Sequence, residues 1–133
     1  MLRYMLDTNI CIYVLRHQYP ELRERLDRHA ESLAVSSVVL SELYFGAENS
    51  SRPDENHRVI ESFAARLMVL PFDTPAAFHS GRVRAELKRD GQPIGAYDLM
   101  IAGHARSTGL TLVTNNEREF CRVRGLLVEN WLQ

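Results

Sequence analysis

The amino-acid sequence predicts an α/β fold in which a central parallel sheet of about four to five strands is flanked by helices. Two observations predict it. Short apolar runs of strand length alternate with longer segments of helical periodicity along the chain. No repeat, linker or low-complexity segment interrupts the 133 residues, so we expect a single domain over residues 1–133.

The first elements follow from apolar runs and from residues that start helices. Residues 2–7 predict a buried strand, after which Thr8 or Asn9 caps a helix. Pro20 then begins a charged helix, because proline suits the first turn. Residues 33–36 predict the second strand.

Helix-capping residues and a proline indicate where the helices in the middle of the chain begin. Ser36 or Ser37 caps the helix that follows the second strand. Another helix is expected over about residues 55–66, and residues 68–72 predict the third strand. Thr74, which a proline follows, marks the start of the next helix.

The C-terminal elements are bounded by glycines. The helix that starts at Thr74 is expected to run to about residue 89. The next helix, which contains Asp98, ends at Gly109, because glycine readily adopts the conformation that terminates helices. Residues 110–114 predict the fourth strand and residues 126–128 a fifth.

Three acidic residues stand in apolar surroundings. Asp7 ends the first apolar run, and Glu42 and Asp98 each have apolar neighbours at helical spacing. An unpaired carboxylate in such a place costs on the order of several kcal/mol. Singly, Asp7 can cap a helix, Asp98 can be a first-turn acid, and Glu42 can pair with a buried arginine. Together the three acids predict one positively charged group that offsets the charge of all of them, for which a divalent cation is the simplest candidate.

The ends of the predicted strands indicate where this cation would bind. In a parallel α/β sheet, sites form beyond the carboxyl ends of the strands, where Asp7 and Thr114 are expected. Asp98 would lie in the first turn of its helix, where the helix dipole favours an anion. Oxygen ligands select a hard cation, Mg²⁺, which Mn²⁺ can replace. Such an ion activates water beside a phosphate, which predicts phosphodiester chemistry.

Composition and charge limit the partners and the cellular location that we expect for this protein. A net charge of −1 gives no global attraction to nucleic acid, so any such binding must rest on a local patch. No apolar run approaches membrane-spanning length and no signal peptide opens the chain, so we expect a cytoplasmic location without membrane contact. Cys11 and Cys121 form neither a metal motif nor a disulfide framework. His104 is expected to be a core or surface histidine.

Four short motifs occur in order along essentially the whole chain. Each is weak alone, but their order and separations together are specific. They are Met5-Leu6-Asp7-Thr8-Asn9, Ser41-Glu42-Leu43, Tyr97-Asp98-Leu99-Met100-Ile101-Ala102 and Thr114-Asn115-Asn116. On these motifs the sequence resembles the PIN-domain ribonucleases and, within them, the VapC toxins of bacterial toxin–antitoxin systems.

The resemblance implies a PIN-like three-layer fold and a role for individual residues. Asp7, Glu42 and Asp98 match the acidic metal site of the family. Asn9 matches the small polar residue beside the first aspartate, and Thr114 matches the hydroxyl residue that ends the fourth strand. We therefore expect the three acids to be metal ligands and the other two residues to support them.

The resemblance is incomplete at one position. The family often has a fourth acid after the fourth strand, where this chain has Asn116. Asn116 can still coordinate a metal through its carbonyl oxygen, but it weakens a second metal site. Glu119, three residues later, can substitute for the missing acid. We expect one well-held ion, with Asn116 and Glu119 among the catalytic residues.

The resemblance also implies an activity. Members of the family cleave RNA, so we expect a Mg²⁺-dependent endoribonuclease toxin that inhibits translation and growth. The tRNA anticodon region, initiator tRNA included, is the leading substrate. Arg82, Arg84 and Lys88 on one expected helix, and Arg118 after the fourth strand, are candidates for binding RNA phosphates. The alternative for these residues is an ordinary solvated surface.

Partners are implied as well. A cognate VapB-type antitoxin would wrap the protein and place its C-terminal tail, often with an arginine, in the acidic site. The protein would form a homodimer, and a higher toxin–antitoxin complex would bind operator DNA through the antitoxin. Burial in the core is the expected position of Tyr44, Phe45 and the apolar side of the helix over residues 55–67, with an interface as the alternative.

The three acids by themselves are also compatible with two other functions. A metal ion and water suit any phosphodiester, so a metal-dependent DNA nuclease or phosphatase is one alternative. A non-catalytic RNA-binding domain whose acids hold a structural ion is the other. The sequence contains neither a Gly-Lys-Ser/Thr phosphate loop nor a Gly-x-Ser-x-Gly elbow, so no competing catalytic motif is visible.

Overall fold

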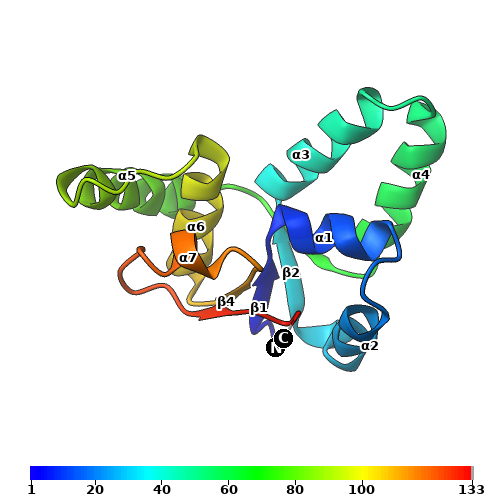
Figure 1. The fold of residues 1–133 in the computed structure, drawn as a ribbon, viewed down its shortest axis with the longest axis horizontal. Coiled ribbons are helices and arrows are strands. Elements are labelled where there is room, and N and C mark those ends of the chain that lie inside the picture. The colour runs from blue at the N-terminus through cyan, green and yellow to red at the C-terminus, as the bar shows by residue number, and fades with distance from the viewer. Residues whose placement is uncertain (133) are drawn as a thin grey trace.

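Parallel strands form the centre of the fold in the computed structural model, which describes residues 1–132 (Figure 1). The strands are β1 (Tyr4–Leu6), β2 (Leu33–Ser36), β3 (Met68–Leu70), β4 (Thr111–Val113) and β5 (Val128–Glu129). Their order across the sheet is β3-β2-β1-β4-β5, and every pairing is parallel. The predicted parallel α/β fold is confirmed.

Helices connect these strands. The longer ones are α1 (Thr8–Leu15), α2 (Pro20–Arg28), α3 (Ser37–Glu48), α4 (Pro53–Ala64), α5 (Thr74–Arg89) and α6 (Ala96–Thr108). A 3₁₀ helix, η1 (Ala30–Ser32), precedes β2, and the short α7 (Glu117–Phe120) follows β4. The sequence did not predict these two short helices, because segments this short cannot display a helical periodicity.

The caps of two helices lie one residue earlier than local signals suggested. Asp7 caps α1 in place of the predicted Thr8 or Asn9, and Asp73 caps α5 in place of Thr74. Each aspartate accepts a hydrogen bond of 3.0 Å from the backbone N–H three residues later. Both sites read Asp-Thr, so each offers two residues that can cap a helix, and the aspartate takes that role.

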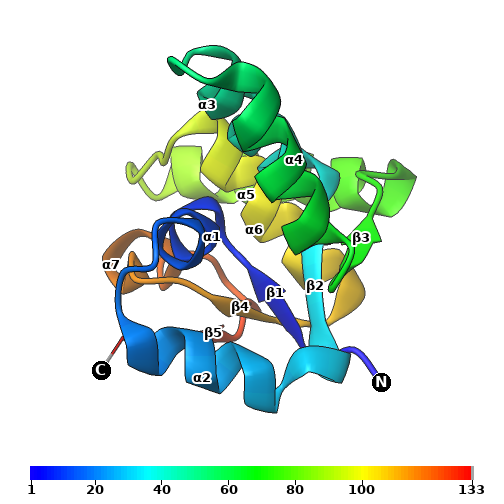
Figure 2. The ribbon, with the colours of Figure 1, turned by 90° about the vertical axis from the view of Figure 1, so that its right-hand side faces the viewer.

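Helices cover both faces of the sheet, as the three-layer prediction requires. Figures 1 and 2 show α5 and α6 on one side of the strands and α1 and α2 on the other. β1 and β2 are buried along their whole length, and Met5 and Leu6 are 0% exposed. The core therefore lies on both sides of the central strand, β1.

The carboxyl ends of the strands meet at one edge of the sheet, because all strands run in the same direction. Asp7 follows β1, Ser36 ends β2 and Thr114 follows β4. The pair of helices α3 and α4 extends above this edge in both views (Figures 1 and 2). Within residues 1–132, none of the helices is long and apolar enough to cross a membrane.

Candidate active site

Asp7 lies at the middle of the carboxyl edge, and its side chain is buried. The Thr114 hydroxyl donates a short hydrogen bond to Asp7 Oδ2, and the Ile10 N–H donates to Oδ1 at 3.0 Å. Burial raises the pKa of Asp7, the Thr114 and backbone hydrogen bonds oppose this, and nearby Glu42 adds to the rise. Asp7 is thus held in one orientation by neutral donors.

Glu42 reaches the same edge from the second turn of α3. The Ser36 side chain caps this helix, accepting from Val38 N–H at 3.1 Å, as one of the two predicted caps would. The Thr8 hydroxyl donates to Glu42 Oε1 at 2.6 Å. This bond ties the first residue of α1 to α3 and turns the Glu42 carboxyl toward the end of β1.

The outer side of α3 is open rather than packed. Phe45, one of the apolar neighbours of Glu42 along the helix, is 72% exposed, so the expected core position of Phe45 is wrong. Tyr44 is partly buried and its ring lies 5.3 Å from the His57 ring. Glu42 therefore stands at the margin of the core, where a ligand can reach it.

Asp98 lies in the first turn of α6 and faces Glu119 of α7. Burial raises the pKa of Asp98 to about 6, and Glu119, Asp7 and Glu42 add to the rise. The structure thus brings four acids, from the end of β1 and from α3, α6 and α7, close enough to influence one another.

Asn116 interacts with one of these acids. Its Nδ2 donates to Glu119 Oε2 at 2.9 Å, and its backbone N–H donates to Thr114 Oγ1 at 2.9 Å. The loop between β4 and α7 therefore positions two parts of the site. Thr114 holds Asp7, and Asn116 holds Glu119.

The four acids have no positively charged partner. No Lys or Arg among residues 1–132 forms an ion pair with Asp7, Glu42, Asp98 or Glu119. The raised pKa of Asp7 and of Asp98, together with oxygen-only donors, fits a hard divalent cation. No three His, Cys, Asp or Glu side chains in the described chain lie close enough together to enclose an ion.

Two of the acids are held by neutral hydrogen-bond donors. Thr8 holds the Glu42 carboxyl, and Asn116 holds the Glu119 carboxyl, each through one hydrogen bond. The chemistry of the donor set fits a metal ion. The roles of the acids as metal ligands stay a prediction.

The other candidate residues lie around this cluster. Asn9 is exposed, and its backbone N–H, rather than its side chain, bonds to Asp7. Arg82, Arg84 and Lys88 are exposed on α5, and Arg118 is exposed on α7 beside Glu119. None of these four basic side chains forms an ion pair within residues 1–132.

Sequence reasoning missed one residue of the cluster. Thr8 was considered as a helix cap, whereas its hydroxyl holds Glu42. The available signal was its position between Asp7 and Asn9 in the first motif. No local pattern pairs Thr8 with a residue thirty-four positions later, so the partner was not predictable from the sequence.

Comparison with known proteins agrees with this geometry. Residues 4–126 match the PIN domain. The chain is 53% identical over 131 residues to the tRNA(fMet)-specific endonuclease VapC of Shigella flexneri, covering 98% of this chain and 99% of that protein. The chain belongs to the VapC group of PIN-domain ribonucleases. It is also 49% identical over 132 residues to Ribonuclease VapC2 of Haemophilus influenzae, covering 99% and 100% of the two chains.

Solved structures of VapC proteins have the same fold. The DNA-bound VapBC crystal structure from Salmonella typhimurium matches with a TM-score of 0.95 and 50% identity, over 98% of this chain and 99% of that one. VapBC2 from Rickettsia felis, bound to a promoter DNA fragment, matches with a TM-score of 0.92 and 39% identity, over 98% and 99%. PIN-domain nucleases generally need a divalent metal ion, which agrees with the donor set described above.

Proposed function

We propose that this VapC-group protein is a Mg²⁺-dependent endoribonuclease toxin that cleaves tRNA in the anticodon region, with initiator tRNA as the preferred substrate. One observation carries the proposal. Asp98 is a partly buried carboxyl whose pKa is raised by burial and by three further acids, with no cation to offset them. The names of relatives at about half identity, which specify tRNA(fMet), support the substrate.

The proposed metal ligands are Asp7, Glu42 and Asp98, with Glu119 as the fourth acid. A bound Mg²⁺ would supply an activated water and neutralise charge on the scissile phosphate. The protein's own contribution is orientation. Thr114 and the start of α1 fix Asp7, and Thr8 fixes Glu42. Asn116 orients Glu119.

Basic residues beside the acids would hold the RNA backbone. Arg84 and Lys88 line a cavity of about 600 Å³ together with Ala96 and Leu99, which flank Asp98 in the first turn of α6. Among residues 1–132 neither of the two basic side chains forms an ion pair with an acid, so both can bind phosphate. We propose the same role for Arg82 and for Arg118.

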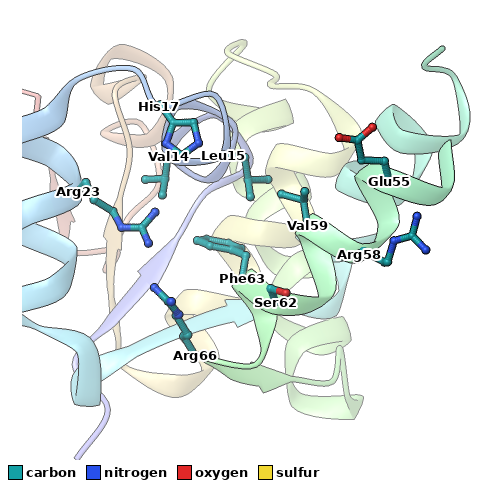
Figure 3. A pocket seen from close by; sticks show the side chains of 10 residues that line it. All are labelled: Val14, Leu15, His17, Arg23, Glu55, Arg58, Val59, Ser62, Phe63 and Arg66. Atoms are coloured by element: carbon teal, nitrogen blue, oxygen red, sulfur yellow. The ribbon is translucent and has the colours of Figure 1, made fainter. Parts of the chain in front are cut away.

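The partner would be a cognate VapB-type antitoxin. A cavity of about 370 Å³ between α1, α2 and α4 has Val14, Leu15 and Phe63 as apolar walls (Figure 3). Figure 3 shows Arg23 and Arg66 reaching toward the space beside the Phe63 ring. An apolar cavity with two guanidinium groups suits a segment that carries apolar and acidic side chains.

A neighbouring cavity supports a path from this segment to the acids. It has a volume of about 240 Å³, shares Leu15 and Val59 with the first cavity and is lined by Glu42. A peptide that occupies the first cavity could therefore continue to the acidic cluster and place a basic residue there. The complex would contain a homodimer of this chain and bind operator DNA through the antitoxin, in the cytoplasm.

The first experiment uses the purified protein free of antitoxin. It is incubated with total bacterial tRNA in Mg²⁺ or in EDTA, beside Asp7→Asn, Asp98→Asn and the control Asp54→Asn, whose carboxyl is exposed in α4. We expect a discrete Mg²⁺-dependent cut by the wild type and Asp54→Asn, and none by the other two variants. Retained cleavage by folded Asp7→Asn and Asp98→Asn would overturn the proposal. Cleavage of single-stranded DNA or of small phosphoesters instead of RNA would identify a different substrate.

A further inference from the structure

His104 is a buried polar residue that the proposed chemistry does not use. It lies on α6, between one and two turns after Asp98, and its side chain is 1% exposed. Burial lowers the pKa of His104, while Asp73 acts in the opposite direction. The imidazole is therefore neutral at pH 7. Of the two expectations for this residue, the core position is confirmed.

The imidazole has one defined side-chain partner. His104 Nδ1 lies 2.9 Å from Ser36 Oγ, and Ser36 is 0% exposed. The Ser36 oxygen already accepts from Val38 N–H at 3.1 Å. A hydroxyl oxygen has a second lone pair as well as a proton, so Ser36 Oγ can donate to Nδ1 or accept from Nδ1–H, according to the imidazole tautomer.

This hydrogen bond joins the two helices that present acids to the site. Ser36 is the cap of α3, which carries Glu42, whereas His104 belongs to α6, which carries Asp98. Within residues 1–132 it is the one side-chain hydrogen bond between α6 and the segment that begins α3.

Neighbouring contacts hold the junction from the side of β3. The Phe72 ring packs edge-on against the His104 ring, with centroids 5.6 Å apart, and Phe72 N–H donates to Ser37 Oγ at 3.0 Å. Two consecutive serines thus anchor the start of α3 in different directions. Ser36 connects it to α6, and Ser37 connects it to the loop after β3.

We propose that His104 is a positioning residue, which through Ser36 sets α3 against α6 and thereby the spacing of Glu42 and Asp98 for the metal ion. A hydrogen bond fixes the distance between two elements more narrowly than apolar packing, which permits sliding. The inference rests on the proposed function, because it needs Glu42 and Asp98 to bind the same ion.

The test measures metal binding without RNA. Mn²⁺ is titrated against the full-length protein, by calorimetry and by its effect on the melting temperature. His104→Leu keeps a similar volume but removes the hydrogen-bonding group, whereas His104→Asn places an amide, which can donate or accept, near the position of Nδ1. We expect His104→Leu to raise the half-saturating Mn²⁺ concentration about tenfold and His104→Asn to stay near the wild type.

A matched control separates positioning from general stability. Val83→Ala truncates a side chain that is 1% exposed in α5, so it lowers the melting temperature without touching this junction. If His104→Leu and Val83→Ala lose similar stability and both bind Mn²⁺ like the wild type, His104 is only structural and the proposal is overturned. An unchanged His104→Leu overturns it as well.

A second pair of variants covers failure of His104→Leu to fold. Ser36→Ala removes the same bond from the α3 side, together with the cap on Val38 N–H, which Ser36→Asn would keep. Ser37→Ala removes the neighbouring bond to Phe72 without touching His104. We expect weaker Mn²⁺ binding only in Ser36→Ala, and equal binding by both variants contradicts the proposal. Failure of the proposed function would look different. The wild type would then bind Mn²⁺ but cleave no nucleic acid, or Asp98→Asn would bind Mn²⁺ unchanged.

Discussion

The Asn116 side-chain amide donates a hydrogen bond of 2.9 Å to the Glu119 carboxyl, and the charge of this carboxyl helps to raise the pKa of Asp98. Asn116 occupies the position where the PIN-domain family often has a fourth acid. In this chain the acid that faces Asp98 is Glu119 of α7, and Asn116 orients its carboxyl.

This relationship predicts different effects for two substitutions. Asn116→Ala leaves Glu119 in place but loses its orienting donor, so we expect apparent Mg²⁺ affinity to fall about tenfold. Glu119→Gln removes the charge itself, so the loss of cleavage should be larger. Glu117→Gln, on the same short helix, is the control. An inactive Asn116→Ala beside a fully active Glu119→Gln would show that Asn116 is the ligand.

The Thr8 hydroxyl predicts a positioning effect on Glu42. Thr8→Val keeps the shape of the side chain but removes the hydrogen bond of 2.6 Å to Glu42 Oε1. We expect Thr8→Val to require about tenfold more Mg²⁺ for half-maximal tRNA cleavage, and Thr8→Ser to restore the wild-type requirement. Equal activity of Thr8→Val and wild type at limiting Mg²⁺ would argue against this role.

The raised pKa of Asp98 predicts how metal binding depends on pH. With a pKa of about 6, Asp98 is mostly protonated at pH 5 in the metal-free protein. A divalent ion binds the carboxylate, so the proton must leave. Below pH 6, Mn²⁺ affinity measured by calorimetry should fall by at least about tenfold for each unit of pH, and it should level off above pH 7. Equal affinity at pH 5 and pH 7 would contradict carboxylate ligation by Asp98.

The same shift predicts a pH effect on stability without metal. The folded pKa of about 6 exceeds the ordinary aspartate value of 3.8, so between these values the folded state binds the proton more tightly than the unfolded state. Asp98 therefore makes the folded protein more stable as pH falls from about 6 toward about 4. In EDTA, Asp98→Asn should have the higher melting temperature at pH 7, and its advantage should shrink on acidification. The exposed control Asp54→Asn should show no such trend.

Because α5 and α6 cross closely, we expect replacement of two glycines by alanine to have opposite effects on the stability of the protein. A Cβ at Gly103 would lie 2.6 Å from Ser80 Cα, whereas a Cβ at Gly81 would meet nothing within 4 Å. Gly103→Ala should therefore destabilise the protein by about 1–3 kcal/mol. Gly81→Ala should stabilise it by up to about 1 kcal/mol, because alanine favours the helix. Urea unfolding measures both, and equal stabilities of the two variants would contradict the crossing.

The cavity between α1, α2 and α4 predicts a charge effect on antitoxin binding. Arg66→Glu places a negative charge beside Phe63, where we propose that acidic side chains of the antitoxin lie. We expect weaker binding to the cognate antitoxin with unchanged tRNA cleavage by the free protein. Arg28→Glu, at an exposed site in α2 outside the cavity, is the control. Equal antitoxin affinity of both variants would place the interface elsewhere.

Much of the secondary structure could be predicted because its signals are local. β2 covers the predicted residues 33–36, and α6 ends where Gly109 adopts a left-handed conformation. α5 ends at residue 89, as expected. Helix caps were less certain, since Asp7 and Thr8 both have side chains that can cap the helix, and only the folded chain shows which one does.

From the sequence alone, Asp7 could be placed at a strand end, Asp98 at a helix start and Glu42 on the apolar face of a helix, and the alignment of parallel strands predicted that such positions converge. The tertiary structure decided what each acid contacts. Thr114 lies beside Asp7 because β4 pairs with β1. Contacts of this kind join residues far apart in the chain, such as Ser36 and His104, so they depend on the strand order and on packing between helices. No local pattern encodes that order, which is why the acids were predictable and their partners were not.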